Sequence, residues 1–321
     1  MSQGILSFAA LLALSGLPSL AVAGAYPPVD VPMRLEQVSA HVYFVRGEPG
    51  AATDNAGFIS NAGVVVTPEG LVFIDALGSP SLAAKFLALV RQVSDLPVRR
   101  VILTHYHADH VYGLQVFKDL GAEVWAPEGA RDYLSADTAE NLLATRRVEL
   151  APWINAETHL VPPDRYLTAD ADFTLGGVRF RVTPLGVAHS EGDLAVFVEP
   201  DGVMFSGDII FEGRIPWLGS SNTRNWLATL ERMERITVRA LIPGHGKAAA
   251  KPREALTLTR RYLAFVREKM GAAVRNWEAF DDAYDGIDWG EWEFLPAFAE
   301  ANRRNAYQVF LSLERESLEK P

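Results

Sequence analysis

Four short apolar runs in this chain each lead into a residue that can bind or support a metal ion. They are Phe73-Ile74 before Asp75, Val101–Leu103 before Thr104 and His105, Val203–Phe205 before Asp208, and Leu241-Ile242 before His245. Runs of this length predict buried β-strands. In layered α/β proteins, ligands bind at the carboxyl ends of strands, in the loops that leave them. The sequence therefore predicts that these residues converge on one edge of the fold.

The rest of the chain predicts an α/β protein in which short strands alternate with helices. We expect strands at 41–45, 57–60, 64–66, 71–74, 101–103, 124–126, 178–183, 194–198, 203–205 and 240–242. Helices are expected at about 81–93, 111–120, 139–150 and 225–236, followed by a helical tail. The long irregular segment at about 127–170 is interpreted as an insertion. This gives one domain over 24–250 and a C-terminal helical extension over 251–321, packed on it.

The first 23 residues have the pattern of a secretory signal peptide. An apolar run from Ile5 to Leu17 is broken by Pro18, and Ala21-Val22-Ala23 forms a small-x-small cleavage site before Gly24. Cleavage after residue 25 fits the pattern as well. No basic side chain precedes the apolar run, so only the terminal amine supplies the usual positive charge. We expect an exported, periplasmic protein with no membrane span in the mature chain.

Composition limits the chemistry further. The formal net charge of −10 argues against nucleic acid as a partner, because binding to phosphates needs a basic face. A small-molecule substrate is expected instead. The chain contains no cysteine, so it has no disulfide, no thiolate nucleophile and no thiolate metal ligand. Any metal must therefore be held by histidines and carboxylates.

The segment His105-Tyr106-His107-Ala108-Asp109-His110 places four potential ligands within six residues. Imidazole suits zinc, and aspartate adds an oxygen ligand that reduces the positive charge of the site. A loop this short cannot easily surround one ion from every side. Two metals that share the loop are the simpler arrangement.

His-x-His-x-Asp-His after a strand, followed by isolated His189, Asp208 and His245, resembles the metallo-β-lactamase superfamily. The resemblance covers about residues 38–250. It implies an αββα sandwich of two mixed β-sheets flanked by helices, with two metal ions between the sheets. One ion would be held by His105, His107 and His189, the other by Asp109, His110 and His245, and Asp208 would bridge both. Asp75 resembles the family's aspartate that supports the metal loop without binding metal.

The resemblance implies a dinuclear zinc hydrolase, with iron and manganese left as alternatives. Two divalent ions lower the pKa of a bridging water, and the resulting hydroxide attacks a small ester, thioester, lactone or lactam. Asp109 and Asp208 are the candidate catalytic residues, since either carboxylate could steer or accept the proton. Two alternatives stay open: β-lactam hydrolysis, and a non-catalytic metal-binding accessory of a periplasmic redox system.

Features beyond the ligand set refine this hypothesis. The cysteine-dependent β-lactamase subclasses are excluded, because Asp208 stands at the position of their metal-bound cysteine. The continuation from Gly207 to Pro216 is similar to that of exported metallohydrolases linked to quinoprotein or thiosulfate-oxidation systems. Four residues that follow Asp208 are candidates either for the wall of a substrate pocket or for the core: Phe211, Ile215, Pro216 and Trp217. Asp193 is expected to be solvated or structural, outside the ligand set.

Overall fold

The computed structural model describes residues 26–134 and 136–318, so the expected signal peptide lies outside the described residues. Strands β1 to β7 form one mixed sheet in sequence order. Its first four strands pair antiparallel, and β4 to β7 pair parallel. The strands are β1 (Leu35–Gln37), β2 (Val42–Val45), β3 (Ala62–Thr67), β4 (Gly70–Ile74), β5 (Val98–Ile102), β6 (Glu123–Pro127) and β7 (Arg165–Leu167).

The second sheet has the order β12-β11-β10-β9-β8. Only β11 and β12 pair parallel, and the other pairs are antiparallel. The strands are β8 (Ala171–Leu175), β9 (Val178–Gly186), β10 (Asp193–Val198), β11 (Val203–Phe211) and β12 (Ala240–His245). Apolar side chains from both sheets, including Phe44, Ile102, Val182 and Phe205, form the core between them. The two sheets therefore pack face to face.

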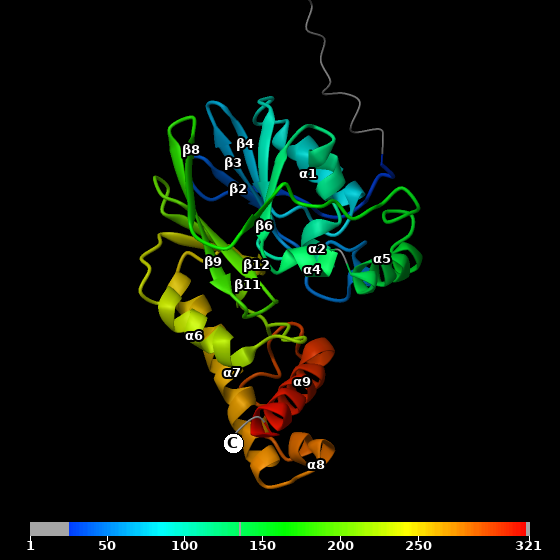
Figure 1. Cartoon of the computed structure of the whole chain (residues 1–321), viewed down its shortest axis with the longest axis vertical. Helices are drawn as coiled ribbons and strands as arrows, with labels where there is room; N and C mark the ends of the chain where they lie inside the picture. The colour runs from blue at the N-terminus through cyan, green and yellow to red at the C-terminus, as the bar shows by residue number, and fades with distance from the viewer. Residues whose placement is uncertain (1–25, 135, 319–321) are drawn as a thin grey trace, which may run out of the picture.

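Helices cover the outer faces of both sheets. On the first sheet, α1 (Pro80–Val90) and α3 (Leu114–Lys118) enclose a second apolar core. The α1 helix begins where Ser79 Oγ accepts a hydrogen bond from the Leu82 amide at 3.1 Å, ahead of a proline at the first turn. On the second sheet lie α6 (Thr223–Met233) and α7 (Pro252–Arg275). The result is the αββα sandwich expected from the sequence (Figure 1).

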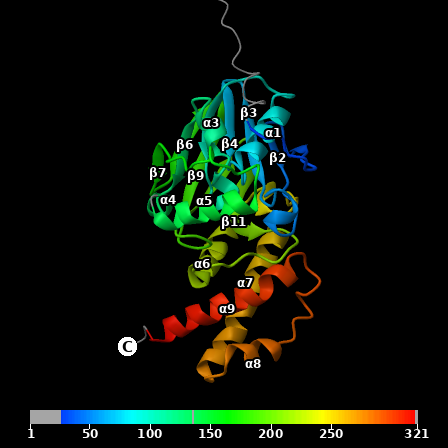
Figure 2. The ribbon, with the colours of Figure 1, turned by 90° about the vertical axis from the view of Figure 1, so that its right-hand side faces the viewer.

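The chain beyond the sandwich is helical, as expected. The 24-residue helix α7 runs from the second sheet toward α8 (Phe280–Asp285) and α9 (Phe298–Leu318), which lie together at the far end of the molecule (Figure 2). Buried Asn305 ties α9 to the loop after β11, because its amide donates to Pro216 O at 2.7 Å and its oxygen accepts from the Leu218 amide at 2.9 Å. The start of α9 is thereby fixed beside that loop. Among the described helices, none combines the length and apolar character needed to cross a bilayer.

The segment at 127–170 contains regular structure of its own. Between β6 and β7 lie α4 (Ala130–Leu134) and α5 (Asp137–Glu149), which approach the sheet edge near the short helix α2 (Ala108–Val111) (Figure 1). The expected strand at 57–60 is wrong. These residues form turns after a 3-10 helix, η1 (Ala52–Asp54), and Ala56 and Gly57 adopt positive φ angles of 55° and 81°, outside the β region of an extended strand.

Candidate metal centre

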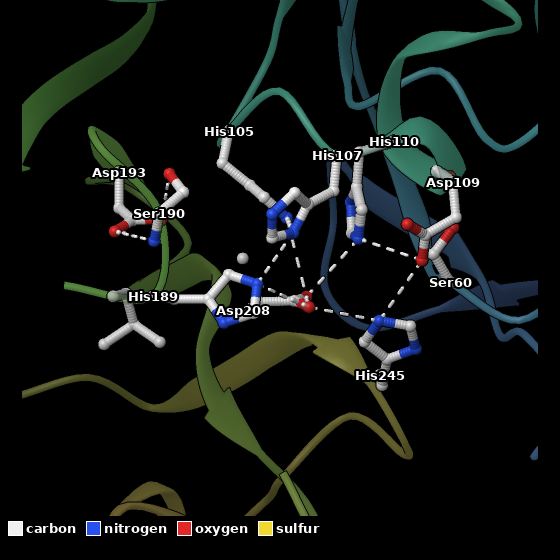
Figure 3. A network of polar contacts seen from close by, with 12 residues as sticks. Ser60, His105, His107, Asp109, His110, His189, Ser190, Asp193, Asp208 and His245 are labelled. Atoms are coloured by element: carbon white, nitrogen blue, oxygen red, sulfur yellow. Dashed lines mark hydrogen bonds and ion pairs between the residues drawn. The ribbon is translucent and has the colours of Figure 1, made fainter. Parts of the chain in front are cut away.

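The seven predicted ligands come from four separate segments and meet at one edge of the sandwich (Figure 3). His105 follows β5, and His107 precedes α2, the helix that contains Asp109 and His110. His189 lies in the loop between β9 and β10, Asp208 lies within β11, and His245 ends β12. All are buried except His107 and Asp109, which are partly exposed. The expected convergence at strand ends is therefore present.

The seven side chains form two groups, within each of which the potential ligand atoms lie less than 4.8 Å apart. The first group comprises His105, His107, His189 and Asp208, and the second comprises Asp109, His110 and His245. In the first, His107 Nδ1 lies 3.1 Å from His105 Nε2 and 2.9 Å from His189 Nε2. Three imidazole nitrogens thus point at one small volume, an arrangement typical of metal ligands.

Asp208 faces both groups. Its Oδ2 lies 3.3 Å from His189 Nε2 in the first group and 3.2 Å from His245 Nε2 in the second. Its Oδ1 lies 3.4 Å from His110 Nε2. The second group is closed by Asp109 Oδ2, which lies 3.5 Å from His110 Nε2 and 3.4 Å from His245 Nε2. A carboxylate in this position can contact two ions at once.

Asp75 organises the loop from behind, although it does not belong to either group. It accepts hydrogen bonds from Thr104 N at 2.7 Å, Thr104 Oγ1 at 2.8 Å and His110 Nδ1 at 2.9 Å. Thr104 Oγ1 in turn lies 3.1 Å from His105 Nδ1. A proton on the Nδ1 atom of each histidine satisfies these contacts and leaves both Nε2 lone pairs directed toward the centre.

Asn61 and Gly244 shape the loop that carries His245, and sequence reasoning missed both roles. Asn61 Nδ2 donates to Pro243 O at 2.7 Å and to Gly246 O at 3.0 Å. A Cβ atom on Gly244 would lie 1.8 Å from Asp208 Oδ1, so only glycine allows this close approach. His245 Nδ1 donates to Ile59 O at 2.7 Å, which fixes its ring. No local sequence signal identifies Asn61, since its partners lie more than 180 residues away.

Burial and charge set the protonation of the cluster. Burial lowers the pKa of His189 to about 3 and, together with the neighbouring His110 charge, holds the pKa of His105 well below its usual range. Burial also acts on His110, but Asp109, Asp208 and Asp75 outweigh it and raise the pKa of His110 well above its usual range. Despite its burial, the surrounding histidines hold the pKa of Asp208 well below its usual range. Without metal, the site therefore combines neutral His105 and His189 with ionised Asp208, whereas His110 favours its charged form. A metal ion bound at His110 Nε2 would displace that proton.

The donor set fits divalent metal ions. His110 Nε2 and Asp208 Oδ1 are buried and have no hydrogen-bond partner, which is costly for polar atoms in a protein interior. Both atoms face the centre of the cluster, where a cation would satisfy them (Figure 3). Nitrogen and carboxylate ligands without sulfur suit zinc, manganese and iron.

Asp193 is buried, so the solvated alternative was wrong and its role is structural. Its carboxylate accepts hydrogen bonds from Ser190 N and Ser190 Oγ, both at 3.0 Å. Burial raises the pKa of Asp193 to about 8, although the bonds from Ser190 act in the opposite direction. The side chain shapes the turn that follows His189 and does not join the ligand atoms (Figure 3).

A cavity of about 470 Å³ adjoins the cluster, and four of the seven predicted ligands line it. These are His107, Asp109, Asp208 and His245. Its other walls come from residues 50–53, from α5, from the loop after β11 and from residues 297–301 at the start of α9. Of the four candidates for the pocket wall or the core, Phe211 and Trp217 line the cavity, although Phe211 also belongs to the core. Ile215 and Pro216 are buried away from the cavity.

Comparisons with known proteins agree with this geometry. The chain is 24% identical over 243 residues to a linear primary-alkylsulfatase of Pseudomonas sp. (strain ATCC 19151), a match that covers 64% of this chain and 46% of the relative. It is 27% identical over 227 residues to an acyl-coenzyme A thioesterase of Gallus gallus, covering 64% of this chain and 72% of the relative. The chain thus spans less than half of the alkylsulfatase.

Among solved structures, an inverting sec-alkylsulfatase from Pseudomonas sp. aligns with a TM-score of 0.68 at 17% identity. The alignment covers 90% of this chain and 52% of that one, so the fold is shared well beyond the sandwich. The family model of the metallo-beta-lactamase superfamily matches residues 55–245, a range that contains all seven clustered side chains. The chain therefore belongs to the metallo-beta-lactamase superfamily.

Proposed function

We propose that this protein is a dinuclear, zinc-dependent hydrolase of small esters or thioesters. The single observation that carries the proposal is the position of Asp208, whose two oxygens face both ligand groups beside a substrate-sized cavity. One metal would be held by His105, His107 and His189, the other by Asp109, His110 and His245, with Asp208 shared. Zinc is proposed because three imidazoles and carboxylate oxygens suit it and no thiolate is present.

When bound, two divalent ions would supply Lewis acidity that activates a water molecule and polarises a substrate oxygen. The side chains of the centre would balance charge, accept a proton and fix the tautomers of the histidines. Asp208 is 4% exposed, and its carboxylate balances charge between the two groups. Asp109 is 21% exposed and lines the cavity, so one of its oxygens can bind metal while the other accepts the proton of the attacking water. Thr104 and Asp75 keep the imidazoles of His105 and His110 in the tautomers that can bind metal.

The substrate class is proposed from the relatives together with the cavity. One relative is named as an alkylsulfatase and another as an acyl-coenzyme A thioesterase, names that denote the hydrolysis of a sulfate ester and of a thioester. Aromatic Phe211 and Trp217 line this cavity beside charged residues, which suits a small substrate with an apolar part and a polar reacting group. We expect weak or absent β-lactam hydrolysis. Export to the periplasm remains part of the proposal.

Metal analysis followed by a substrate panel tests this function. Purified protein should turn over carboxylic esters, thioesters or sulfate esters, lose the activity on chelation and regain it when zinc is restored. Parallel reconstitution with manganese and iron identifies the preferred metal. Turnover that survives complete metal removal would refute the mechanism. A metal-loaded protein that binds two ions and hydrolyses no member of the panel would instead favour the non-catalytic accessory role.

A further inference from the structure

Arg214 is an unpaired cation on the wall of the substrate cavity. It lies in the loop between β11 and α6, one residue after Gly213, whose φ is +66°. Its Nε atom is buried and has no hydrogen-bond partner. In the described part of the chain, no carboxylate oxygen lies within 4.0 Å of its guanidinium. A buried, charged donor without a partner is costly and needs an explanation.

The other arginines near this cavity already have partners. Arg146, on α5, lines the same cavity, but its guanidinium pairs with Glu149 at 2.7 Å. Arg304, on α9, is exposed and lies over the ring of Trp217, 4.8 Å from its centroid. Arg214 therefore differs from both in presenting unused donors to the cavity.

The acids around Arg214 are those of the metal centre. Burial lowers the pKa of Arg214, and Asp208, Asp109 and Glu300 oppose this from a distance. An arginine in this environment stays charged. Asp109 and Asp208 also face the histidines of both ligand groups, so bound metal ions would take up their charge. Arg214 would then stand beside a cationic centre with no counter-ion of its own. An anion in the cavity resolves this imbalance.

We propose that Arg214 determines specificity by binding a negatively charged group of the substrate, a carboxylate or a sulfate, next to the bond that is cleaved. This deepens the proposed hydrolase function and rests on it. A guanidinium offers paired donors that match the planar carboxylate or two sulfate oxygens. The favoured substrates are thus anionic esters. An uncharged ester of the same size lacks the group that Arg214 binds.

A matched pair of esters tests this directly. Mono-p-nitrophenyl glutarate and p-nitrophenyl pentanoate share leaving group and acyl length but differ in one carboxylate, and p-nitrophenyl sulfate carries the anion on the reacting group itself. Arg214→Gln should reduce kcat/KM for an anionic ester by about 10- to 100-fold, the range of a lost charged hydrogen bond, and spare the pentanoate. Arg304→Gln removes the same charge outside the cavity and should change none of these values.

The two anionic esters also identify the source of the charge. A selective loss with the glutarate places the anion on the acyl chain, whereas a selective loss with the sulfate places it on the reacting group. Either result supports the proposal. An unchanged ratio of anionic to neutral ester in Arg214→Gln, or the loss of that preference in Arg146→Gln instead, would overturn it while leaving the hydrolase function intact.

Binding without turnover provides an independent readout. Calorimetric titration of zinc-loaded protein with succinate should give an affinity about 10- to 100-fold lower in Arg214→Gln, with no change for neutral succinamide. If no ester is hydrolysed but this difference is found, the hydrolase proposal fails and the anion site stands. If the Gln variant does not fold, Arg214→Lys decides, because an ammonium cannot form the paired contact. Unchanged succinate affinity in folded Arg214→Lys would then overturn the guanidinium contact.

Discussion

Replacing Asp75 with alanine should weaken metal binding although Asp75 itself is not a ligand. The carboxylate is buried and accepts three hydrogen bonds, two from Thr104 and one from His110 Nδ1. Without it, His110 and His105 lose the chain of contacts that fixes their rings. Asp75 also adopts a φ of +61°, which aspartate and asparagine tolerate better than alanine.

The magnitude follows from the contacts that are lost. Each buried donor left without an acceptor costs about 1–3 kcal/mol, and the left-handed backbone adds about 1 kcal/mol for alanine. Since Thr104 Oγ1 can rotate to another acceptor, two donors are left unpaired, and we expect Asp75→Ala to lower the free energy of unfolding by about 3–7 kcal/mol. Loss of such support typically lowers metal affinity by about 10- to 100-fold. Asp75→Asn keeps an acceptor and the tolerated backbone angle, so both effects should be smaller.

Two measurements and one matched control separate support of the metal from general stability. Urea unfolding of metal-free protein reports stability, and competition with a chromophoric chelator reports zinc affinity. Asp201 is the control, because this buried carboxylate also accepts three bonds, from Ser39 Oγ, His41 N and His41 Nδ1, far from the ligands. Asp201→Ala should reduce stability and leave zinc affinity unchanged. Equal zinc affinities in Asp75→Ala and wild type would refute the assigned role of Asp75.

Three further predictions follow from the structure. Burial raises the pKa of Asp193 to about 8, so the folded protein keeps a proton that the unfolded chain releases above about pH 4. The stability that protonated Asp193 contributes is therefore full below pH 4 and is lost as pH rises through 8. We compare the free energies of unfolding of metal-free wild type and Asp193→Asn by urea titration. The difference, wild type minus variant, should fall by up to about 1.4 kcal/mol per pH unit between pH 4 and 8. A difference that does not change with pH would contradict the raised pKa of Asp193. Gly244→Ala places a Cβ atom 1.8 Å from Asp208 Oδ1 and should reduce kcat by at least about 100-fold without unfolding the chain. The control Gly271→Ala, in helix α7, should be tolerated. Near-normal turnover of Gly244→Ala would show that the loop shifts easily to accept the methyl group. Intact-mass analysis of exported protein should show removal of the first 23 or 25 residues, and a mass that includes Met1 would contradict export by this signal.

The clustering of the candidate ligand residues was predictable because each stands at a strand end or in a compact motif. The strands β1 and β7 were missed because each has three residues, too few to show a period. The strand β8 was overlooked, although its apolar residues alternate with exposed Asp172 and Thr174, a pattern that predicts a strand. The turn at 57–60 was mistaken for a strand because positive φ angles at Ala56 and Gly57 leave little trace in the sequence.

Apart from Asp75, which the family resemblance identified, the residues that support the centre could not be predicted, because their partners are distant along the chain. Thr104 precedes a ligand, but its role depends on Asp75, 29 positions earlier. Asn61 acts on the His245 loop, 182 positions away at Pro243. Arg214 resembles any surface arginine until the fold places it on the cavity wall. Such roles arise from tertiary contacts, which a local pattern does not encode.

The most direct test of the dinuclear site is the metal content of Asp208→Asn. A neutral amide neither balances the charge of two ions nor bridges them well, so the metal pair should weaken while the fold survives. Zinc-supplemented wild type should hold close to two ions per chain, and Asp193→Asn, which alters a buried carboxylate outside both ligand groups, should hold the same. Mass spectrometry of metal content after desalting should give one ion or fewer for Asp208→Asn, with turnover nearly abolished. Two tightly held ions and unchanged turnover in this variant would contradict the bridging role of Asp208.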